Sequence, residues 1–253
     1  MRILLTNDDG IHAPGLGVLE QIAGALSDDV WVVAPESDQS GVSHSLSLND
    51  PLRLREIGPR RFAVKGTPTD CVIMGVRHIL DDAPDLVLSG VNRGQNVAED
   101  VTYSGTIAGA IEGTILGIAS IALSQAYGVS TRQHPHWDTA LRHGPDLIRR
   151  LLAEGMPRDV MVNVNFPDCA PDAVKGIAVT MQGKRDQELL RIEARHDGRG
   201  NPYYWLVFAR REQQEPRGGT DLSAVADNRI AVTPLRLDLT DEPFMTRLAE
   251  LFG

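Results

Sequence analysis

Short apolar runs alternate with longer segments of helical periodicity through the first half of the chain. The apolar runs read as strands that are buried on both faces, because apolar residues follow one another without alternation. These runs lie at residues 2–7, 29–35, 85–90 and 118–125, and the expected helices between them at 16–27, 69–80 and 106–117. Strands that alternate with helices indicate an α/β fold with a mostly parallel sheet.

The pattern changes in three places. Residues 51–66 read as a β-hairpin that closes at Gly58-Pro59. After about residue 125 a helix over 136–153 leads into a strand at 161–167. The tail adds a strand and linker at 229–239 and a short amphipathic helix at 242–252.

Residues 177–215 alternate apolar and charged positions about a Gly/Asn/Pro turn, which predicts a long two-stranded arm projecting from the core. An isolated hairpin is marginal in water, so the arm must dock, and a second copy of the chain is the expected partner. The alternative is a hairpin that packs on its own domain. We therefore expect a core at 1–130, and a part at 131–253 that completes it and carries the arm at about 180–218.

The charge and the cysteine content argue against a nucleic-acid-binding protein and against a disulfide-stabilised one. With 34 acidic and 25 basic side chains the net charge is -9, so the surface should repel a nucleic acid polymer. A small anion can still bind, because backbone N–H groups or one metal ion outweigh this field locally. Cys71 and Cys169 lie far apart and outside any C-x-x-C pattern, which favours reduced thiols.

The sequence also favours a cytoplasmic location. The first residues lack the apolar region of a signal peptide. No run approaches the ~20 apolar residues that span a bilayer, so we expect no membrane partner.

Two acidic residues, Asp8 and Asp9, follow the first predicted strand, where ligands of parallel sheets bind. Both can face one site only if the chain turns, and Gly10 permits a turn. Two converging carboxylates are typical ligands of Mg²⁺ or Mn²⁺. An Asx turn or a helix cap made by Asp9 alone is the alternative. The spacing argues against an Asp-x-Asp phosphoaspartyl nucleophile.

Two further loops offer neutral oxygen ligands. Ser40 could present its hydroxyl to a metal and His44 could reach an anion, although Ser-Gly is also ordinary turn chemistry. Asn92 and Asn96 follow the strand at 85–90 and offer amide oxygens.

A helix start follows the second of these loops. Ser104, Gly105 and Thr106 begin the helix at 106–117, and a helix N-terminus with small residues is a usual phosphate site. Plain N-capping by Ser104 and Thr106 is the alternative. A metal site and an anion site at one sheet edge together indicate phosphate chemistry.

The motifs resemble those of the SurE family, the survival-protein nucleotidases. The matching segments are ILLTNDDG, APESDQSGVSHSLSL, GTPTDCV, LSGVNRGQN, YSGTIAGAIEG, VNVNFP and TDLSAVADNRIAVTPL, which span nearly the whole chain. The resemblance implies a Rossmann-like three-layer core and a metal-dependent phosphatase of nucleoside 5′-monophosphates, some members also accepting 3′-nucleotides or short polyphosphate. Ser43 stands where the family pattern has glycine.

The resemblance also implies the roles of individual residues. One Mg²⁺ or Mn²⁺ per subunit would be held by Asp8, Asp9, Ser40 and Asn92. Segments at about 220–253 would exchange between subunits of a homodimer or homotetramer.

Our hypothesis for the reaction assigns the remaining residues. Asp8 and Asp9 are the catalytic candidates, and either could accept the proton of the attacking water. Asn96, Ser104, Gly105 and Thr106, with His44, would bind the phosphate or the substrate. A broad phosphomonoesterase or polyphosphatase, a non-catalytic nucleotide-sensing module and an assembly protein remain the alternatives.

Overall fold

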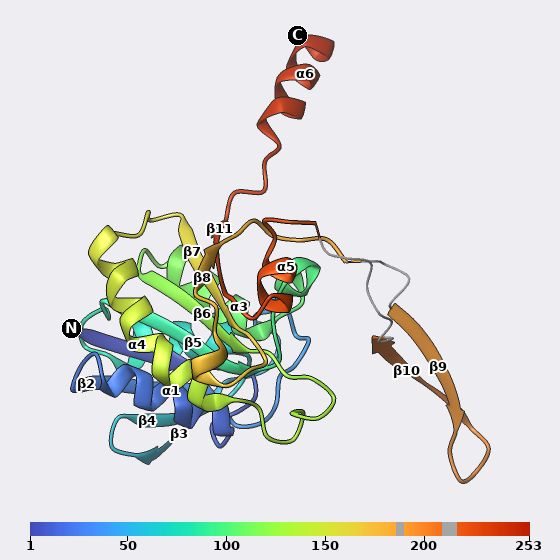
Figure 1. Cartoon of the computed structure of the whole chain (residues 1–253). Coiled ribbons are helices and arrows are strands. Elements are labelled where there is room, and N and C mark those ends of the chain that lie inside the picture. The colour runs from blue at the N-terminus through green and yellow to red at the C-terminus, as the bar shows by residue number, and fades with distance from the viewer. Residues whose placement is uncertain (186–189, 209–216) are drawn as a thin grey trace.

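One mixed sheet forms the centre of the computed structural model, which describes residues 1–185, 190–208 and 217–253 (Figure 1). Its strands, in spatial order, are β3 (Arg53–Gly58), β4 (Arg61–Lys65), β2 (Asp29–Pro35), β1 (Arg2–Thr6), β5 (Leu86–Arg93), β6 (Ala119–Gln125), β7 (Val160–Phe166), β11 (Ile230–Arg236) and β8 (Ile177–Val179). The strands from β4 to β7 run parallel, whereas β3 pairs antiparallel with β4 and β11 pairs antiparallel with β7. The predicted α/β fold with a mostly parallel sheet is confirmed.

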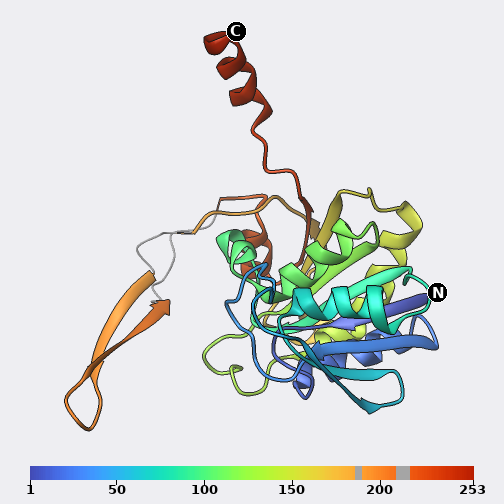
Figure 2. The same cartoon turned by 180° about the vertical axis from the view of Figure 1, so that it is seen from behind.

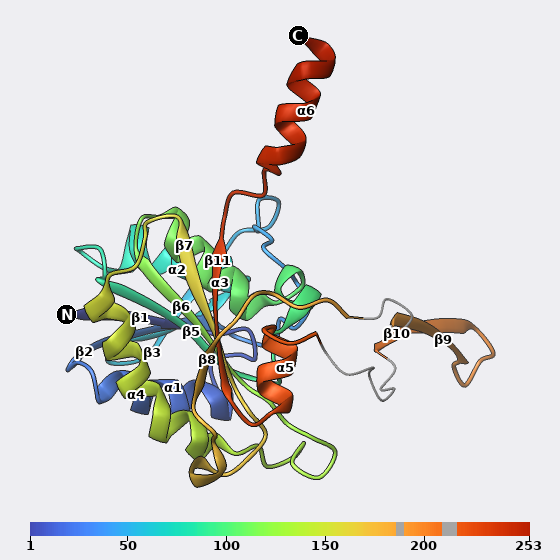
Figure 3. The ribbon, with the colours of Figure 1, turned by 45° about the horizontal axis from the view of Figure 1, so that its top comes forward.

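Helices cover both faces of the sheet (Figure 3). The helices α1 (Pro14–Gly24) and α4 (Trp137–Glu154) pack on one face, and α2 (Pro68–Met74), its π-helical continuation (Gly75–Ile79) and α3 (Gly105–Ile115) pack on the other. In β1, Ile3 and Leu5 join the α1 side and Leu4 joins the α2 side, and all three are fully buried. Burial on both faces is the reason that this strand reads as a continuous apolar run.

The second half of the chain completes the same sheet, because β7 and β11 are interior strands. The arm prediction needs a correction at its start, since residues 177–179 form β8, the edge strand paired with β11. An alternation of period two fits either an arm strand or an edge strand of the sheet, so the pattern could not separate them.

A separate hairpin, β9 (Leu190–His196) with β10 (Pro202–Phe208), projects from the body, and so does the terminal helix α6 (Glu242–Phe252) (Figures 1 and 2). Residues 186–189 and 209–216 of the predicted arm lie outside the described residues. Large apolar side chains are exposed on both elements, among them Trp205, Leu206 and Phe252. Exposed apolar surface of this kind is typical of a protein–protein contact. In the described part of the chain no helix has the length and apolarity to cross a membrane.

Candidate functional site

The loops after β2, β1 and β5 meet because these three strands are neighbours. The Gln39 N–H donates to the Asp8 carbonyl oxygen at 2.7 Å, and the Arg93 N–H donates to Asp9 Oδ2 at 3.1 Å. These contacts place the four predicted metal ligands in one cluster of loops: Asp8, Asp9, Ser40 and Asn92.

The start of α3 packs directly against the buried Asp8 carboxylate. Thr106 Oγ1 donates a hydrogen bond to Asp8 Oδ1, and Asp8 is only 4% exposed. A β-carbon on Gly105 would lie 2.7 Å from Asp8 Cβ and 3.2 Å from Pro68 Cγ, so only glycine fits this close approach. Ser104 Oγ accepts the Ile107 N–H at 3.1 Å, as a capping residue does.

The two carboxyl groups are costly to ionise where they lie. Burial raises the pKa of Asp8 to about 6, and the negative charge of Asp9 adds to this, while the Thr106 hydroxyl opposes it. Burial also raises the pKa of Asp9, which the Arg93 backbone N–H partly offsets. A cation between the two carboxylates would remove this penalty.

The donor set fits a hard divalent cation. Asn92 Nδ2 donates to the Gly94 carbonyl oxygen at 2.9 Å, which leaves the amide oxygen available as a ligand. Ser40 is exposed, and its N–H donates to Asp38 Oδ1 at 2.7 Å, which fixes the backbone that carries the hydroxyl. No group of three His, Cys, Asp or Glu side chains suited to a metal occurs in the described ranges. Two carboxylates with an amide and a hydroxyl oxygen suit Mg²⁺ or Mn²⁺ rather than a softer metal.

Asn96 lies in a buried asparagine network. Its N–H donates to Asn165 Oδ1 at 2.8 Å, and its carbonyl oxygen accepts Asn163 Nδ2 at 2.8 Å. Its own side chain donates to Ser124 Oγ at 3.0 Å. We did not predict Asn163 and Asn165 as site residues, although two buried polar positions in the apolar strand VNVNF are a readable signal. A phosphate role for Asn96 stays a prediction.

His44 is turned toward α3. Its Nε2 lies 2.9 Å from Glu112 Oε2. Glu112 is buried, and it lies on α3 about two helical turns after Gly105. One ring nitrogen of His44 is therefore engaged away from the helix start, and the contact of His44 with an anion stays a prediction.

Ser43, where the resemblance leads us to expect glycine, adopts the left-handed backbone conformation with φ 57°. Two hydrogen bonds offset the strain of this conformation. Ser43 Oγ donates to the Thr102 carbonyl oxygen at 2.7 Å, and the Ser43 backbone N–H donates to the Tyr103 carbonyl oxygen at 3.1 Å. The serine thus ties the loop after β2 to the loop before α3.

This geometry predicts an order of stability for two variants of Ser43. Ser43→Ala keeps the left-handed strain and loses the hydroxyl bond, so its free energy of unfolding should fall by about 1 kcal/mol. Ser43→Gly loses the same bond but relieves the backbone strain, so its free energy of unfolding should fall less than that of Ser43→Ala. Urea denaturation of both variants measures this, and a Ser43→Gly protein less stable than Ser43→Ala would contradict it.

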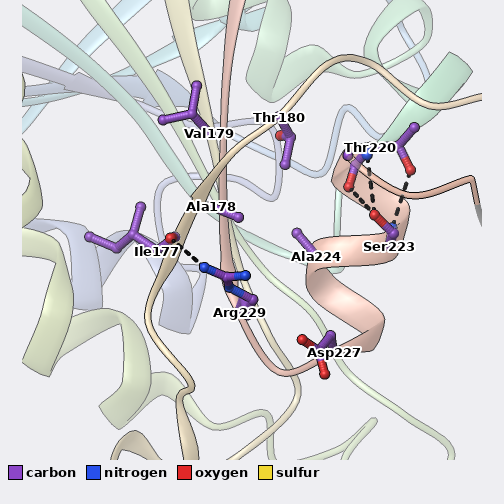
Figure 4. Close-up of a pocket in the computed structure, with 10 residues that line it drawn as sticks. Ile177, Ala178, Val179, Thr180, Thr220, Ser223, Ala224, Asp227 and Arg229 are labelled. Carbon is purple, nitrogen blue, oxygen red and sulfur yellow. Dashed lines mark hydrogen bonds between the residues drawn. The ribbon is translucent and has the colours of Figure 1, made fainter.

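A hollow of about 520 Å³ lies elsewhere, between β8 and the short helix α5 (Asp221–Ala226) (Figure 4). Of the charged groups that line it, Asp227 forms an ion pair with Lys175 at 2.7 Å, and Arg229 donates to the Ile177 carbonyl oxygen at 3.2 Å. The hollow is separate from Asp8 and Asp9, because these residues follow the central strand β1 whereas β8 is an edge strand of the sheet.

The fold and the loop cluster define an α/β protein with a candidate ligand site where its parallel strands end. The family model "Survival protein SurE" matches residues 3–189. The chain belongs to the SurE family. It is 72% identical to 5′-nucleotidase SurE of Methylobacterium nodulans and 68% identical to that of Rhodopseudomonas palustris, over 100% of each chain. The crystal structure of SurE protein from Aquifex aeolicus matches with a TM-score of 0.84 and 42% identity, over 100% of both chains.

Proposed function

We propose that this protein is a metal-dependent 5′-nucleotidase, which hydrolyses nucleoside 5′-monophosphates to nucleoside and phosphate. The observation that carries the proposal is the buried Asp8 carboxylate at the start of α3, which is bonded to Thr106 and is followed by the half-buried Asp9. Relatives named 5′-nucleotidase SurE align with this chain from end to end, which supports the same reaction class.

Asp8, Asp9, Ser40 and Asn92 would hold one Mg²⁺ or Mn²⁺ per subunit. When bound, this ion supplies Lewis-acid polarisation of the phosphate and activation of a water. The raised pKa values of the two carboxyls support the assignment, because a nearby cation favours their ionised form.

The rest of the site binds and orients the phosphate. The first N–H groups of α3, at Gly105 and Thr106, would donate to phosphate oxygens, because they lie at the positive end of the helix. Either Asp8 or Asp9 would accept the proton of the attacking water. Thr106 holds the Asp8 carboxylate in place through its hydroxyl.

We further propose a homodimer or homotetramer that forms through the C-terminal part of the chain. Support comes from the apolar side chains exposed on the hairpin and on α6, which are costly to leave in water. A cytoplasmic location is part of the same proposal.

A phosphate-release panel tests the reaction, the metal and the substrate class together. Nucleoside 5′-monophosphates should release phosphate with Mn²⁺ or Mg²⁺, and a chelator should stop release until metal is added in excess. 3′-Nucleotides, a sugar phosphate and short polyphosphate serve as comparison substrates. Equal rates on all of them favour a broad phosphomonoesterase or polyphosphatase, and saturable nucleotide binding without release favours a sensing module. Full activity in chelator contradicts the metal dependence.

A further inference from the structure

The loop at residues 94–104, which we call the site loop, joins β5 to the start of α3. Ala98 in this loop is fully buried and has the left-handed backbone angle φ 54°. This conformation is unfavourable for a residue with a side chain, so surrounding contacts must hold it. The site loop is therefore kept in place by residues outside it.

The two segments that flank the hairpin supply these contacts. The Ala98 N–H donates to Asp221 Oδ2 at 2.9 Å, and Gln182 Nε2 donates to the Ala98 carbonyl oxygen at 2.9 Å. Asp221 is fully buried, and its Oδ1 also accepts the N–H groups of Gly183 at 2.8 Å and Leu222 at 2.7 Å. One buried carboxylate thus joins the site loop, the segment before the hairpin and the first turn of α5.

Arg185 makes a second connection to the same loop. Its N–H donates to Glu99 Oε2 at 2.7 Å, and its guanidinium forms an ion pair with Asp100 Oδ2. The Asp100 carbonyl oxygen in turn accepts the N–H groups of Tyr103 and Ser104, each at 3.0 Å. Because Ser104 is the N-cap of α3, Arg185 acts on the residue that begins the helix.

We propose that Asp221 and Arg185 are positioning residues, which hold the start of α3 against the Asp8 carboxylate through the site loop. The inference rests on the proposed nucleotidase function and deepens it. Only a short stretch of chain separates Ala98 and Asp100 from Thr106, whose hydroxyl binds Asp8. A loosened site loop therefore displaces phosphate-binding N–H groups and a metal ligand at once. Small displacements of this kind reduce turnover more than binding.

The test compares three variants of the full-length protein. Asp221→Asn preserves shape but cannot accept all of the N–H groups that the carboxylate accepts. Arg185→Gln removes the ion pair with Asp100. Asp227→Asn is the matched control, because this aspartate follows the same short helix, is exposed, and pairs with Lys175 outside the site loop.

We expect kcat for a nucleoside 5′-monophosphate with Mn²⁺ to fall at least about ten-fold in Asp221→Asn and several-fold in Arg185→Gln, with KM little changed. Amide hydrogen exchange at residues 97–104 should accelerate in both variants, while β7 stays protected. Asp227→Asn should keep kcat within about two-fold of the wild type.

Several results would overturn the proposal. Folded Asp221→Asn and Arg185→Gln proteins with wild-type kcat and wild-type exchange in the site loop contradict it. A change in KM alone, or an equal loss in Asp227→Asn, contradicts it as well. If Asp221→Asn does not fold, Arg185→Gln decides. A wild-type protein that releases no phosphate contradicts the proposed function instead, and the exchange measurement still tests the positioning.

Discussion

Asp8→Asn is expected to lower the rate of phosphate release by at least about 100-fold, and at the same time to stabilise the metal-free protein at neutral pH. The loss of rate follows from the loss of one anionic ligand beside the start of α3. The Thr106 hydroxyl can still donate to the asparagine oxygen, so the local structure should persist. Activity and stability would then move in opposite directions.

The gain in stability follows from the raised pKa of Asp8. In the folded protein without metal this pKa is about 6, compared with an ordinary value of 3.8. A raised folded pKa means that folding favours the protonated carboxyl, so the wild type loses stability as the pH rises from about 4 to about 6. Asparagine does not ionise, so Asp8→Asn avoids a loss of up to about 3 kcal/mol at pH 7.

Thermal unfolding in chelator measures this effect. The melting temperature of Asp8→Asn should exceed that of the wild type by several degrees at pH 7, and the two should converge below about pH 4. Saturating Mn²⁺ should raise the melting temperature of the wild type and leave the variant nearly unchanged. Equal melting temperatures in chelator at pH 7 would show that Asp8 carries no ionisation penalty.

Gly15→Ala is expected to have the other large effect, a fall of at least about 2 kcal/mol in the free energy of unfolding. Gly15 lies where α1 crosses β5, and a β-carbon there would collide with the Val91 carbonyl oxygen and lie 3.2 Å from Trp137 Cη2. The helix would have to move away from the end of β5, which carries the proposed ligand Asn92. Metal affinity should therefore fall together with stability.

Gly17→Ala is the matched control on the same helix. Apart from the backbone of α1 itself and the two neighbouring residues, nothing lies within 4 Å of a β-carbon at this position, so the alanine only improves helix propensity. Its free energy of unfolding should rise by about 0.5–1 kcal/mol. Urea denaturation of the two variants should give changes of opposite sign, and a loss of stability in both would mean that close packing at Gly15 is not the cause.

Much of the fold could be predicted from the sequence because the central strands are buried on both faces. The continuous apolar run of β2 predicted its bounds, residues 29–35. Local pattern was less informative at the sheet edges and the helix ends. The helix expected at 16–27 begins at Pro14, because proline fits the first turn, where no backbone donor is needed.

The candidate site was predictable only where it follows strand ends. Asp8 and Asp9 come just after β1 and Asn92 lies at the end of β5, so the order of the strands alone indicates that they meet. Ser40 lies in the loop after β2, five residues beyond the end of that strand, and topology places only its loop at this edge. Contacts between distant segments were not predictable. Asp221 reaches Ala98 across more than a hundred residues of sequence, and no local motif at either end reveals that pair.

The point of the sheet from which the hairpin segment is inserted has a consequence for engineering. The two segments that flank the hairpin meet at an isolated parallel bridge between Met181 and Thr220, with the Asp221 N–H donating to the Met181 carbonyl oxygen at 3.0 Å. The entropic cost of closing a flexible segment between these two ends grows only slowly with its length, by about 0.6 kcal/mol for each doubling. We therefore expect that a segment of different length can replace the hairpin β9–β10 while the sheet stays intact, provided that Gln182 and Arg185 keep their contacts with the site loop.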